Sequence, residues 1–445
     1  MGAEINIFAG FLYMKFAFYS LGCKTNQFET AALERLCREK GHSVVDFEQD
    51  ADVYVINTCT VTGTGGRKSR TVIRRARRAA RPDAIIAVCG CLGQTSPEQA
   101  AEAGADIVCG VSDRAAVIDR AEQLFCKGRG QAVFYNREPD KKFELLPAGG
   151  IEGRTRALLK VEDGCNNFCS YCIIPYARGR VRSISIAEAR RQVEQLAAEG
   201  YCEAVVTGIE ISSFGQDSGE SLAELIREVC RAAGPNMRIR LGSLEPRTID
   251  REFCREISGL PNLCPHFHPA LQSGCDSVLK RMNRKYDTAR FFESVTLLRE
   301  FFPNCAITTD MIVGFPGESE DEFAQTLEFI KKCGFSAMHI FPYSIRKGTP
   351  AAKMSGQLDR AKKEERAAAA GRIAARMRRE YLERQKGKTL SVLFERCEGG
   401  AWHGHSENYC EVCVNSAADL KNKTVRVAIT DTDGQKLSGE ALTDY

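Results

Sequence analysis

The sequence predicts an α/β protein in three successive parts: a parallel-sheet α/β domain over residues 14–136, a partial (βα)6 barrel over 151–375 and a small all-β barrel over 385–445. Three observations support this fold class. Short apolar runs alternate with helical patterns in the first part, and six more strand–helix units follow in the second. In the third part, short β-rich runs are separated by turn residues, which is typical of a small barrel.

Each element of the first part follows from a local pattern. Short apolar runs predict buried strands at 16–21, 53–57, 85–89 and 106–109. Amphipathic stretches predict the intervening helices at 29–40, 66–80, 97–103 and 113–124. The charged stretch 136–156 contains Gly and Pro and predicts a linker. Residues 1–13, which precede Met14, are expected to be an extension from an upstream start.

The second and third parts show similar local signals. Six strands are predicted at 157–161, 204–209, 238–241, 266–271, 306–313 and 338–341. The helices between them are predicted at 186–199, 221–233, 248–257, 288–301 and 320–332. Six units are fewer than the eight of a closed barrel, so we expect an open barrel with functional loops at the carboxyl ends of its strands. A long basic helix at 357–386 then leads to β-rich runs at 389–395, 401–406, 409–415, 423–430 and 436–442.

Composition narrows the class of protein. The chain has 445 residues and a formal net charge of +4 (62 Lys and Arg against 58 Asp and Glu), too small an excess to mark a nucleic-acid binder by itself. It has 20 cysteines but no signal peptide pattern and no apolar run long enough to cross a membrane. We therefore expect a cytoplasmic protein with reduced thiols, which become candidate metal ligands.

The strongest motif follows the first predicted barrel strand. Cys165, Cys169 and Cys172 have CxxxCxxC spacing, which can hold three corners of a [4Fe–4S] cluster. No fourth cysteine stands at local spacing, so one iron would remain open to chelate the amino and carboxylate groups of a small ligand. The alternatives are buried core cysteines or a zinc site, although zinc usually takes four ligands in paired CxxC motifs.

A second triad lies in the first part. Cys23 in SLGCKTNQFE, Cys59 in INTCTVT and Cys91 in VCGCLGQ each follow a predicted strand. Carboxyl ends of parallel strands meet at one edge of a sheet, so the three thiols could hold a second cluster. Each cysteine alone would more often be a buried structural residue.

The first triad resembles the radical S-adenosylmethionine (SAM) superfamily, and Tyr171 before its third cysteine fits the aromatic residue favoured there. The two triads together resemble the methylthiotransferase family, from about residue 15 to the C-terminus, with further matches in RIRLGSLEP, LQSGCDSVLKRMNRKY and TTDMIVGFPGE. Cys89, two residues before Cys91, stands where the family usually has threonine, and Cys91 is the predicted ligand.

The resemblance implies two [4Fe–4S] clusters and SAM as cofactors. The cluster on Cys165, Cys169 and Cys172 would cleave SAM to a 5′-deoxyadenosyl radical, and the cluster on Cys23, Cys59 and Cys91 would carry the sulfur to be inserted. An electron donor such as flavodoxin or ferredoxin is implied. By analogy, cofactor and substrate would lie among residues at the barrel strand ends: Thr207, Gly208, Ser243, Glu245, Gln272, Ser273 and Asp310.

Two features point to RNA. A basic helix follows the second cysteine of the auxiliary triad, and its candidate phosphate-binding residues are Arg67, Arg70, Arg74, Arg77, Arg78 and Arg81. The alternative is a merely solvated charged face. The C-terminal part resembles the TRAM module, a small RNA-binding barrel.

Histidines and cysteines near the C-terminus form a further candidate metal motif. His403, His405, Cys410 and Cys413 have the spacing of a zinc site, but strand alternation predicts that the two thiols point apart. The histidines at 42, 266, 268 and 339 have no partners at ligand spacing and are interpreted as structural.

Within the family, the cysteine-motif stretches look most like the branch that converts N6-threonylcarbamoyladenosine at tRNA position 37 to its 2-methylthio derivative. The alternatives are the branches that modify isopentenyladenosine in tRNA or an aspartate of a ribosomal protein. Glu210 stands where most relatives are expected to have histidine. A non-enzymatic alternative is an iron–sulfur protein that binds RNA or senses redox state. A monomer is expected.

Overall fold

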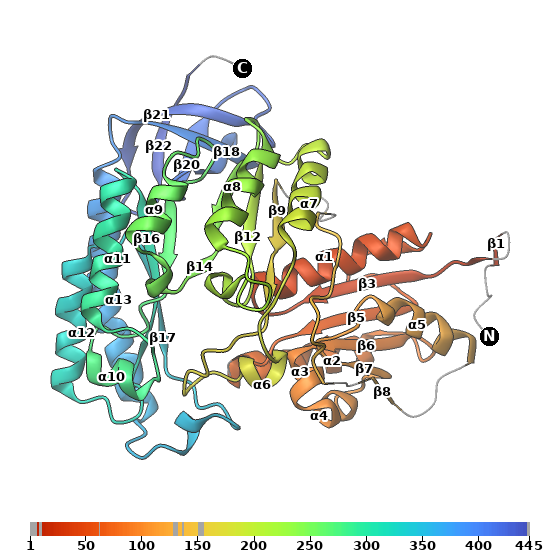
Figure 1. Ribbon diagram of the computed structural model, residues 1–445. Helices are drawn as coiled ribbons and strands as arrows, with labels where there is room; N and C mark the ends of the chain where they lie inside the picture. Colours follow the sequence, from red (N-terminus) through yellow and green to blue (C-terminus); the bar gives the residue numbers. More distant parts are fainter. Residues whose placement is uncertain are drawn as a thin grey trace.

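The computed structural model describes residues 7–8, 11–61, 63–127, 132–135, 138–149 and 155–442. The predicted three-part α/β architecture is confirmed (Figure 1). Parts of the predicted N-terminal extension (1–6 and 9–10) and of the predicted linker (136–137 and 150–154) lie outside the described residues. A short antiparallel pair, β1 (Ile7–Phe8) and β2 (Phe11–Leu12), precedes the first sheet.

The first part is a six-stranded sheet with the order β4-β3-β5-β6-β7-β8, in which all neighbours are parallel. Its strands are β3 (Lys15–Ser20), β4 (Ser43–Val45), β5 (Val53–Thr58), β6 (Ile85–Gly90), β7 (Ile107–Cys109) and β8 (Val133–Tyr135). The two edge strands, β4 and β8, were not predicted, because three residues give no periodic signal. All four predicted strands are present.

Helices cover both faces of this sheet. Apolar side chains of α1 (Lys24–Glu39) and α5 (Ala116–Lys127) pack on one face. Those of α2 (Gly63–Ala79), α3 (Cys91–Thr95) and α4 (Pro97–Glu102) pack on the other. Burial of apolar surface on both faces explains why the strands read as nearly continuous hydrophobic runs.

The second part contains two parallel sheets that curve into an incomplete barrel (Figure 1). One holds β9 (Arg156–Lys160), β12 (Glu203–Thr207) and β13 (Arg238–Leu241). The other holds β14 (Ser243–Leu244), β15 (His266–Pro269), β16 (Ala306–Val313) and β17 (Ala337–Pro342). The six predicted barrel strands are present, and the short β14 is an addition. A small antiparallel pair, β10 (Glu162–Asp163) and β11 (Arg182–Ser183), frames the first cysteine loop.

The outer helices of the barrel begin where side chains cap them. They are α7 (Ile186–Ala198), α8 (Leu222–Ala233), α9 (Arg251–Ile257), α11 (Thr288–Phe301) and α12 (Glu320–Cys333). Ser319 forms a reciprocal capping box with Glu322 at the start of α12, which satisfies two otherwise unpaired N–H groups. Shorter elements are α6 (Ile174–Arg178), α10 (Asp276–Arg281), η1 (Ile211–Ser213), η2 (Pro246–Thr248) and η3 (Pro350–Lys353).

The long helix α13 (Arg360–Glu383) leads to the third part, a closed barrel with the order β18-β19-β20-β22-β21. Its strands are β18 (Thr389–Glu398), β19 (Ala401–Ser406), β20 (Glu411–Asn415), β21 (Thr424–Thr432) and β22 (Leu437–Ala441). A buried arginine of the second part joins it to this barrel. Arg240 binds Glu203 within its own part at 2.7 Å and the carbonyl oxygen of Glu407 in the barrel at 2.8 Å. No helix in the described residues is long and apolar enough to cross a bilayer.

Candidate active site

The first cysteine triad lies in the loop between β10 and α6. Polar hydrogens surround its sulfur atoms: the Asn167 N–H lies 3.5 Å from Cys165 Sγ, and the Ile174 N–H lies 3.4 Å from Cys172 Sγ. Arg284 Nη1 lies 3.2 Å from Cys169 Sγ. Burial raises the pKa of the Cys165 and Cys172 thiols to about 12, whereas these donors stabilise the thiolate form that an iron–sulfur cluster requires.

The second triad gathers at the carboxyl edge of the N-terminal sheet. Cys23 precedes α1, Cys59 follows β5 and Cys91 begins α3. A Cβ atom on Gly22 would lie 2.9 Å from Cys59 Sγ, and the φ angle of Gly22 is +107°, so only glycine fits beside this thiol. Burial raises the pKa of Cys59 to about 11, and the neighbouring thiols of Cys91 and Cys23 oppose its ionisation further. The three cysteines are therefore neighbours.

Cys89 lies elsewhere. It is fully buried in the apolar cluster between the sheet and α1 and α5, whereas α3, which begins at Cys91, packs on the other face through Leu92. This placement favours Cys91 as the third ligand. In the described part of the chain, no three His, Cys, Asp or Glu side chains converge on a single metal ion. A four-iron cube separates its ligating sulfurs more widely than one ion does, and the thiolate-rich, donor-lined triads suit such a cube.

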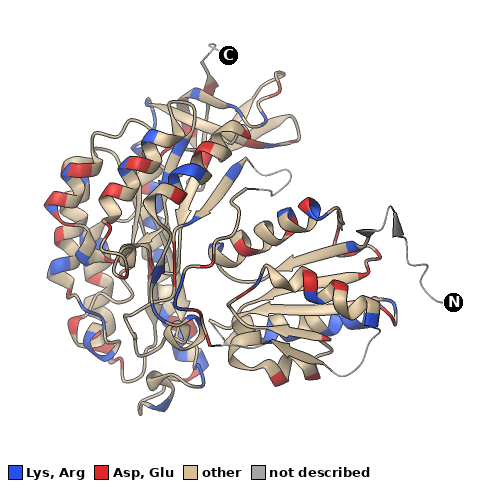
Figure 2. Cartoon of the chain, turned by 45° about the vertical axis from the view of Figure 1, so that its right-hand side comes forward, with Lys and Arg blue, Asp and Glu red and all other residues tan. Residues whose placement is uncertain are grey.

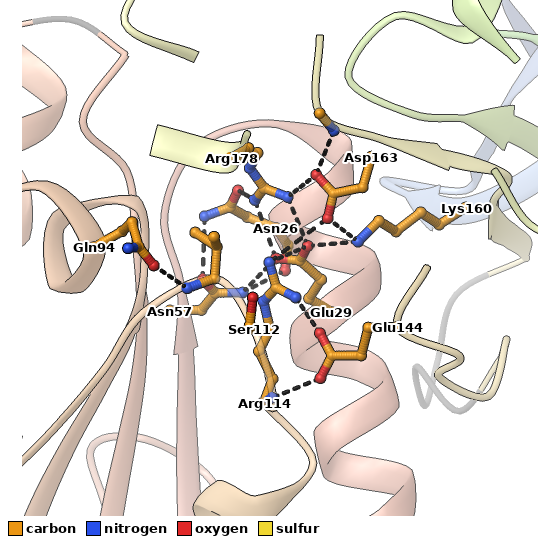
Figure 3. Close-up of polar contacts among 12 residues, drawn as sticks. Asn26, Glu29, Asn57, Gln94, Ser112, Arg114, Glu144, Lys160, Asp163 and Arg178 are labelled. Atoms are coloured by element: carbon orange, nitrogen blue, oxygen red, sulfur yellow. Dashed lines mark hydrogen bonds and ion pairs between the residues drawn. The ribbon is translucent and has the colours of Figure 1, made fainter. Parts of the chain in front are cut away.

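A buried network of charges connects the two triads (Figure 3). Arg178 ends α6, the helix that follows Cys172, and its Nη1 lies 2.8 Å from Glu29 Oε1 on α1 and 3.0 Å from Asp163 Oδ1. Lys160 Nζ also binds both carboxylates, at 2.9 Å and 2.6 Å. Arg114 adds an ion pair to Glu29 at 3.1 Å and a further one to Glu144.

Asn26 extends this network to the auxiliary cysteines. Its side-chain oxygen accepts hydrogen bonds from Arg178 Nη2 at 3.0 Å and from Cys23 Sγ at 3.3 Å. Its amide nitrogen donates to the carbonyl oxygen of Thr58, the residue before Cys59, at 2.9 Å. Burial raises the pKa of Cys91, and the charge and hydrogen bond of Arg178 oppose that rise. The network thus touches all three auxiliary cysteines or their neighbours.

A cavity of about 520 Å³ lies where the three parts of the chain meet. Cys23 and Lys24 line it from the N-terminal domain, and Tyr409 lines it from the C-terminal barrel. Of the predicted strand-end residues, those on its wall are Thr207, Gly208, Ser243 and Asp310. The histidines at 266, 268 and 339 also line it, and each bonds to Thr308 or Asp310 in the wall.

The other three predicted strand-end residues do not line this cavity. Glu245 caps η2 and binds Arg247 at 3.1 Å. Gln272 has a φ angle of +62° and pairs with Met311 in an isolated bridge. Ser273 is fully buried, 3.4 Å from Thr326 Oγ1.

Carboxyl groups gather beside the first triad. The backbone N–H of Glu210 donates to Glu162 Oε2 at 2.7 Å. Burial raises the pKa of Glu210 to about 7, with Arg284 opposing and Glu245 adding to the rise, and burial also raises the pKa of Glu162 well above its ordinary value. The unusual Glu210 therefore belongs to an acidic group that can accept hydrogen bonds from an ammonium group.

The basic face of α2 is smaller than predicted. Arg77 binds Asp106 at 2.9 Å, and Arg81 binds Asp52 at 2.5 Å and Asp50 at 3.1 Å, so both serve the structure of the domain. Arg70 Nη1 binds Gln99 at 3.0 Å. Acidic residues distant in sequence neutralise arginines that have few acidic neighbours in the local sequence. The exposed arginines that remain are Arg67, Arg74 and Arg78. Elsewhere, Figure 2 shows acidic and basic residues interspersed over the outer helices.

The C-terminal histidines and cysteines take separate partners. His405 Nδ1 lies 2.7 Å from Glu395 Oε2. Cys413 Sγ lies 4.0 Å from His403 Nε2, whereas Cys410 is buried in the core cluster of the β-barrel.

Local sequence signals missed several site residues. Arg178 and Arg284 have no local pattern, because Glu29 and Cys169, the partners that link them to the cysteine triads, lie more than 100 residues away in sequence. Arg346, in the loop after β17, interacts electrostatically with Cys59 and Cys91. Only the fold brings these arginines to the cysteines.

Comparisons with known proteins agree with this geometry. The Radical SAM superfamily model matches residues 159–330, and the model "Uncharacterized protein family UPF0004" matches residues 15–110. Threonylcarbamoyladenosine tRNA methylthiotransferase MtaB of Bacillus subtilis is 41% identical over 93% of both chains. The tRNA-2-methylthio-N(6)-dimethylallyladenosine synthase of Pelotomaculum thermopropionicum is 31% identical over 97% of this chain and 98% of its own.

The fold has solved counterparts. The radical S-adenosylmethionine methyltransferase TsrM from Kitasatospora setae, with cobalamin and a [4Fe-4S] cluster bound, has a TM-score of 0.58, covers 76% of both chains and is 15% identical. At that identity the likeness shows the fold alone. The level and extent of identity to the curated relatives confirm the resemblance predicted from the two cysteine triads. The chain belongs to the methylthiotransferase family of the radical SAM superfamily.

Proposed function

We propose that this enzyme converts N6-threonylcarbamoyladenosine at tRNA position 37 to its 2-methylthio derivative. The observation that carries the proposal is the pair of cysteine triads, held on adjoining loops by the Arg178 network beside a cavity between all three parts of the chain. The choice of substrate is supported by identity, which is 41% to the threonylcarbamoyladenosine enzyme and 31% to the dimethylallyladenosine enzyme.

The chain supplies ligands and positioning for this reaction. Cys165, Cys169 and Cys172 would hold one [4Fe–4S] cluster, and Cys23, Cys59 and Cys91 the other. When bound, the clusters and SAM supply the radical and the sulfur that replace an unactivated C–H bond by a methylthio group. Side chains alone could not break that bond by acid–base chemistry at pH 7.

The first triad also marks where SAM would bind. The carboxyl groups of Glu162 and Glu210 lie beside it and would bind the ammonium group of SAM. Arg284 interacts electrostatically with Glu210 and donates to Cys169, a predicted cluster ligand, so it links this acidic group to the cluster site. These side chains orient the cofactor relative to the cavity.

RNA binding would use two surfaces. The exposed Arg67, Arg74 and Arg78 on α2 suit phosphate contacts, and the C-terminal barrel, which carries Tyr409 into the cavity, would contact the anticodon loop. None of the twenty cysteines forms a disulfide, which agrees with action in the reducing cytoplasm. A flavodoxin or ferredoxin would be the electron donor. The chain would act as a monomer.

Mass spectrometry of digested tRNA tests this function. The tRNA is taken from a host that lacks the activity, with and without the cluster-loaded protein expressed in it. We expect a methylthio increment on threonylcarbamoyladenosine that depends on the protein. An increment on isopentenyladenosine instead would move the enzyme to the other tRNA branch. No tRNA change despite loaded clusters would contradict the proposal and direct attention to the ribosomal-protein aspartate or to a non-enzymatic role.

A further inference from the structure

The cavity between the three parts carries positive charge that no acidic side chain in its wall balances. Its acidic wall residues are Asp310 and Glu411. Asp310 Oδ1 lies 3.0 Å from His339 Nδ1 and 3.4 Å from His268 Nε2. Glu411 Oε1 lies 3.2 Å from Arg396 Nη2 and 3.5 Å from His403 Nδ1. Both acids are therefore already compensated.

Two cations of the wall lie outside these pairs: one is Arg378, which donates to the carbonyl oxygen of Gln435, and the other is Lys24. It is exposed, lines the cavity and has no ion-pair partner among the residues that the structure describes. It is also the first residue of α1, whose first turn holds no acidic side chain, so the positive end of the helix dipole adds to its charge. Lys24 and His339 are close enough to interact electrostatically. The hydrogen bond from His339 to Asp310 raises the pKa of His339, which favours its cationic form.

A second observation points to a polar ligand. His266 is 6% exposed, yet its Nδ1 atom has no hydrogen-bond partner, while its Nε2 lies 3.0 Å from Thr308 Oγ1. The ring stacks on Tyr409, with centroids 4.7 Å apart. A buried polar atom without a partner is rare in proteins. In this cavity wall it offers one hydrogen bond to a polar ligand.

We propose that Lys24 and His339 bind the carboxylate of the threonylcarbamoyl group and so determine the choice of this substrate, while His266 Nδ1 hydrogen-bonds to its carbamoyl unit. The inference rests on the proposed function. Threonylcarbamoyladenosine carries a carboxylate, whereas dimethylallyladenosine carries only a hydrocarbon at the same nitrogen. An unpaired lysine at the wall favours the former and gains nothing from the latter.

SAM also has a carboxylate, so SAM is the other ligand whose carboxylate Lys24 and His339 could bind. The geometry favours the tRNA substrate, because Cys23 of the auxiliary triad lines the cavity and none of the first-triad cysteines does. The cluster that would bind SAM would be held by that first triad.

The test compares three anticodon stem-loops with cluster-reconstituted enzyme. One carries threonylcarbamoyladenosine, the second carries the same group with its carboxylate converted to a carboxamide, and the third carries dimethylallyladenosine. The wild-type enzyme is expected to prefer the carboxylate over the carboxamide by roughly ten- to hundredfold in kcat/KM, mainly through KM. Lys24→Gln and His339→Gln should each remove most of that preference. Lys127→Gln, an exposed lysine at the end of α5, is the matched control and should keep it.

Cluster content and SAM binding are measured as well, to separate the possible causes of a loss of activity. Iron content and visible spectra show whether Lys24→Gln disturbs the cluster ligand next to it, and His339→Gln gives the same test away from any cysteine. Equal wild-type use of carboxylate and carboxamide would overturn the inference alone. Equal losses on both substrates, with weaker SAM binding in equilibrium dialysis, would assign the carboxylate site to SAM instead. Activity only on the dimethylallyl stem-loop would overturn the proposed function together with the inference.

Discussion

Arg178 Nη1 lies 2.8 Å from Glu29 Oε1, and this buried contact joins the helix after the first cysteine triad to the helix after Cys23. Both side chains are completely buried. Paired charges are tolerated in an interior only when each finds partners, and here Lys160, Arg114 and Asp163 complete the set. The contact fixes the position of one cluster-binding loop relative to the other.

Glu29→Gln tests the weight of this network. It leaves three cations facing one remaining buried carboxylate, so the free energy of unfolding should fall by about 3–5 kcal/mol. Anaerobic urea denaturation measures the loss. Glu39→Gln on the same helix is the control, because that side chain is 54% exposed and pairs only at the surface. It should change stability by less than about 1 kcal/mol. A similar small effect for both variants would contradict the structural role of Glu29.

Variants of the two triads should differ in the products that they form. Cys172→Ala removes a ligand from the SAM-cleaving site, so formation of 5′-deoxyadenosine should be lost. Cys59→Ala should still yield 5′-deoxyadenosine but no methylthio product, because only the auxiliary site is broken. Chromatography of both products from one reaction measures this. Methylthio product from Cys59→Ala would show that the auxiliary triad is wrongly assigned.

Arg74 and Arg78 on α2 test the proposed phosphate-binding surface. Arg74→Glu with Arg78→Glu should weaken tRNA binding and flatten its dependence on salt, because phosphate contacts release counterions. Fluorescence anisotropy at several salt concentrations measures both. Arg255→Glu on α9 is a control with an exposed arginine outside this face. An unchanged salt slope in the double variant would rule out this surface as a phosphate site.

The C-terminal barrel should show acid sensitivity through Glu395. Despite burial, its bond to His405 and the charge of Arg156 lower the pKa of Glu395 to about 2 from 4.5. A depressed carboxyl pKa stabilises the fold above the unfolded pKa, and that contribution disappears as pH falls from 4.5 toward 2. Glu395→Gln should therefore cost up to about 3 kcal/mol at pH 7, with the difference from wild type narrowing below pH 4.5. Denaturation of the apo protein at several pH values measures it, and a constant difference would contradict the assignment.

The sequence predicts elements well where periodicity is long. All six barrel strands and the five outer helices between them are found, because each buries a continuous apolar face. The start of helix α1 was not predicted correctly from periodicity. It begins at Lys24 rather than at residue 29, because Asn26 and Glu29 are buried by ion pairs and hydrogen bonds across the domain interface, not by apolar packing.

Some site residues have a local sequence signal and others do not. The cysteine triads are recognisable from local spacing and from their places after strands. Arg178, Arg284 and the cavity histidines have partners that only the tertiary fold brings near, so no local pattern indicates them. Arg77 in the basic helix is a similar case: its partner Asp106 is distant in sequence and adjacent in space, so the local sequence does not show that this charge is paired.

The most direct test of the central claim follows one hydrogen atom. An anticodon stem-loop with deuterium at C2 of the threonylcarbamoyladenosine is incubated anaerobically with reconstituted enzyme, SAM and a reductant. We predict that mass spectrometry will find the deuterium in 5′-deoxyadenosine and a methylthio group at C2 of the same nucleoside, in matching amounts. Methylthio product without deuterium in 5′-deoxyadenosine, or no product from enzyme with both clusters loaded, would contradict the account.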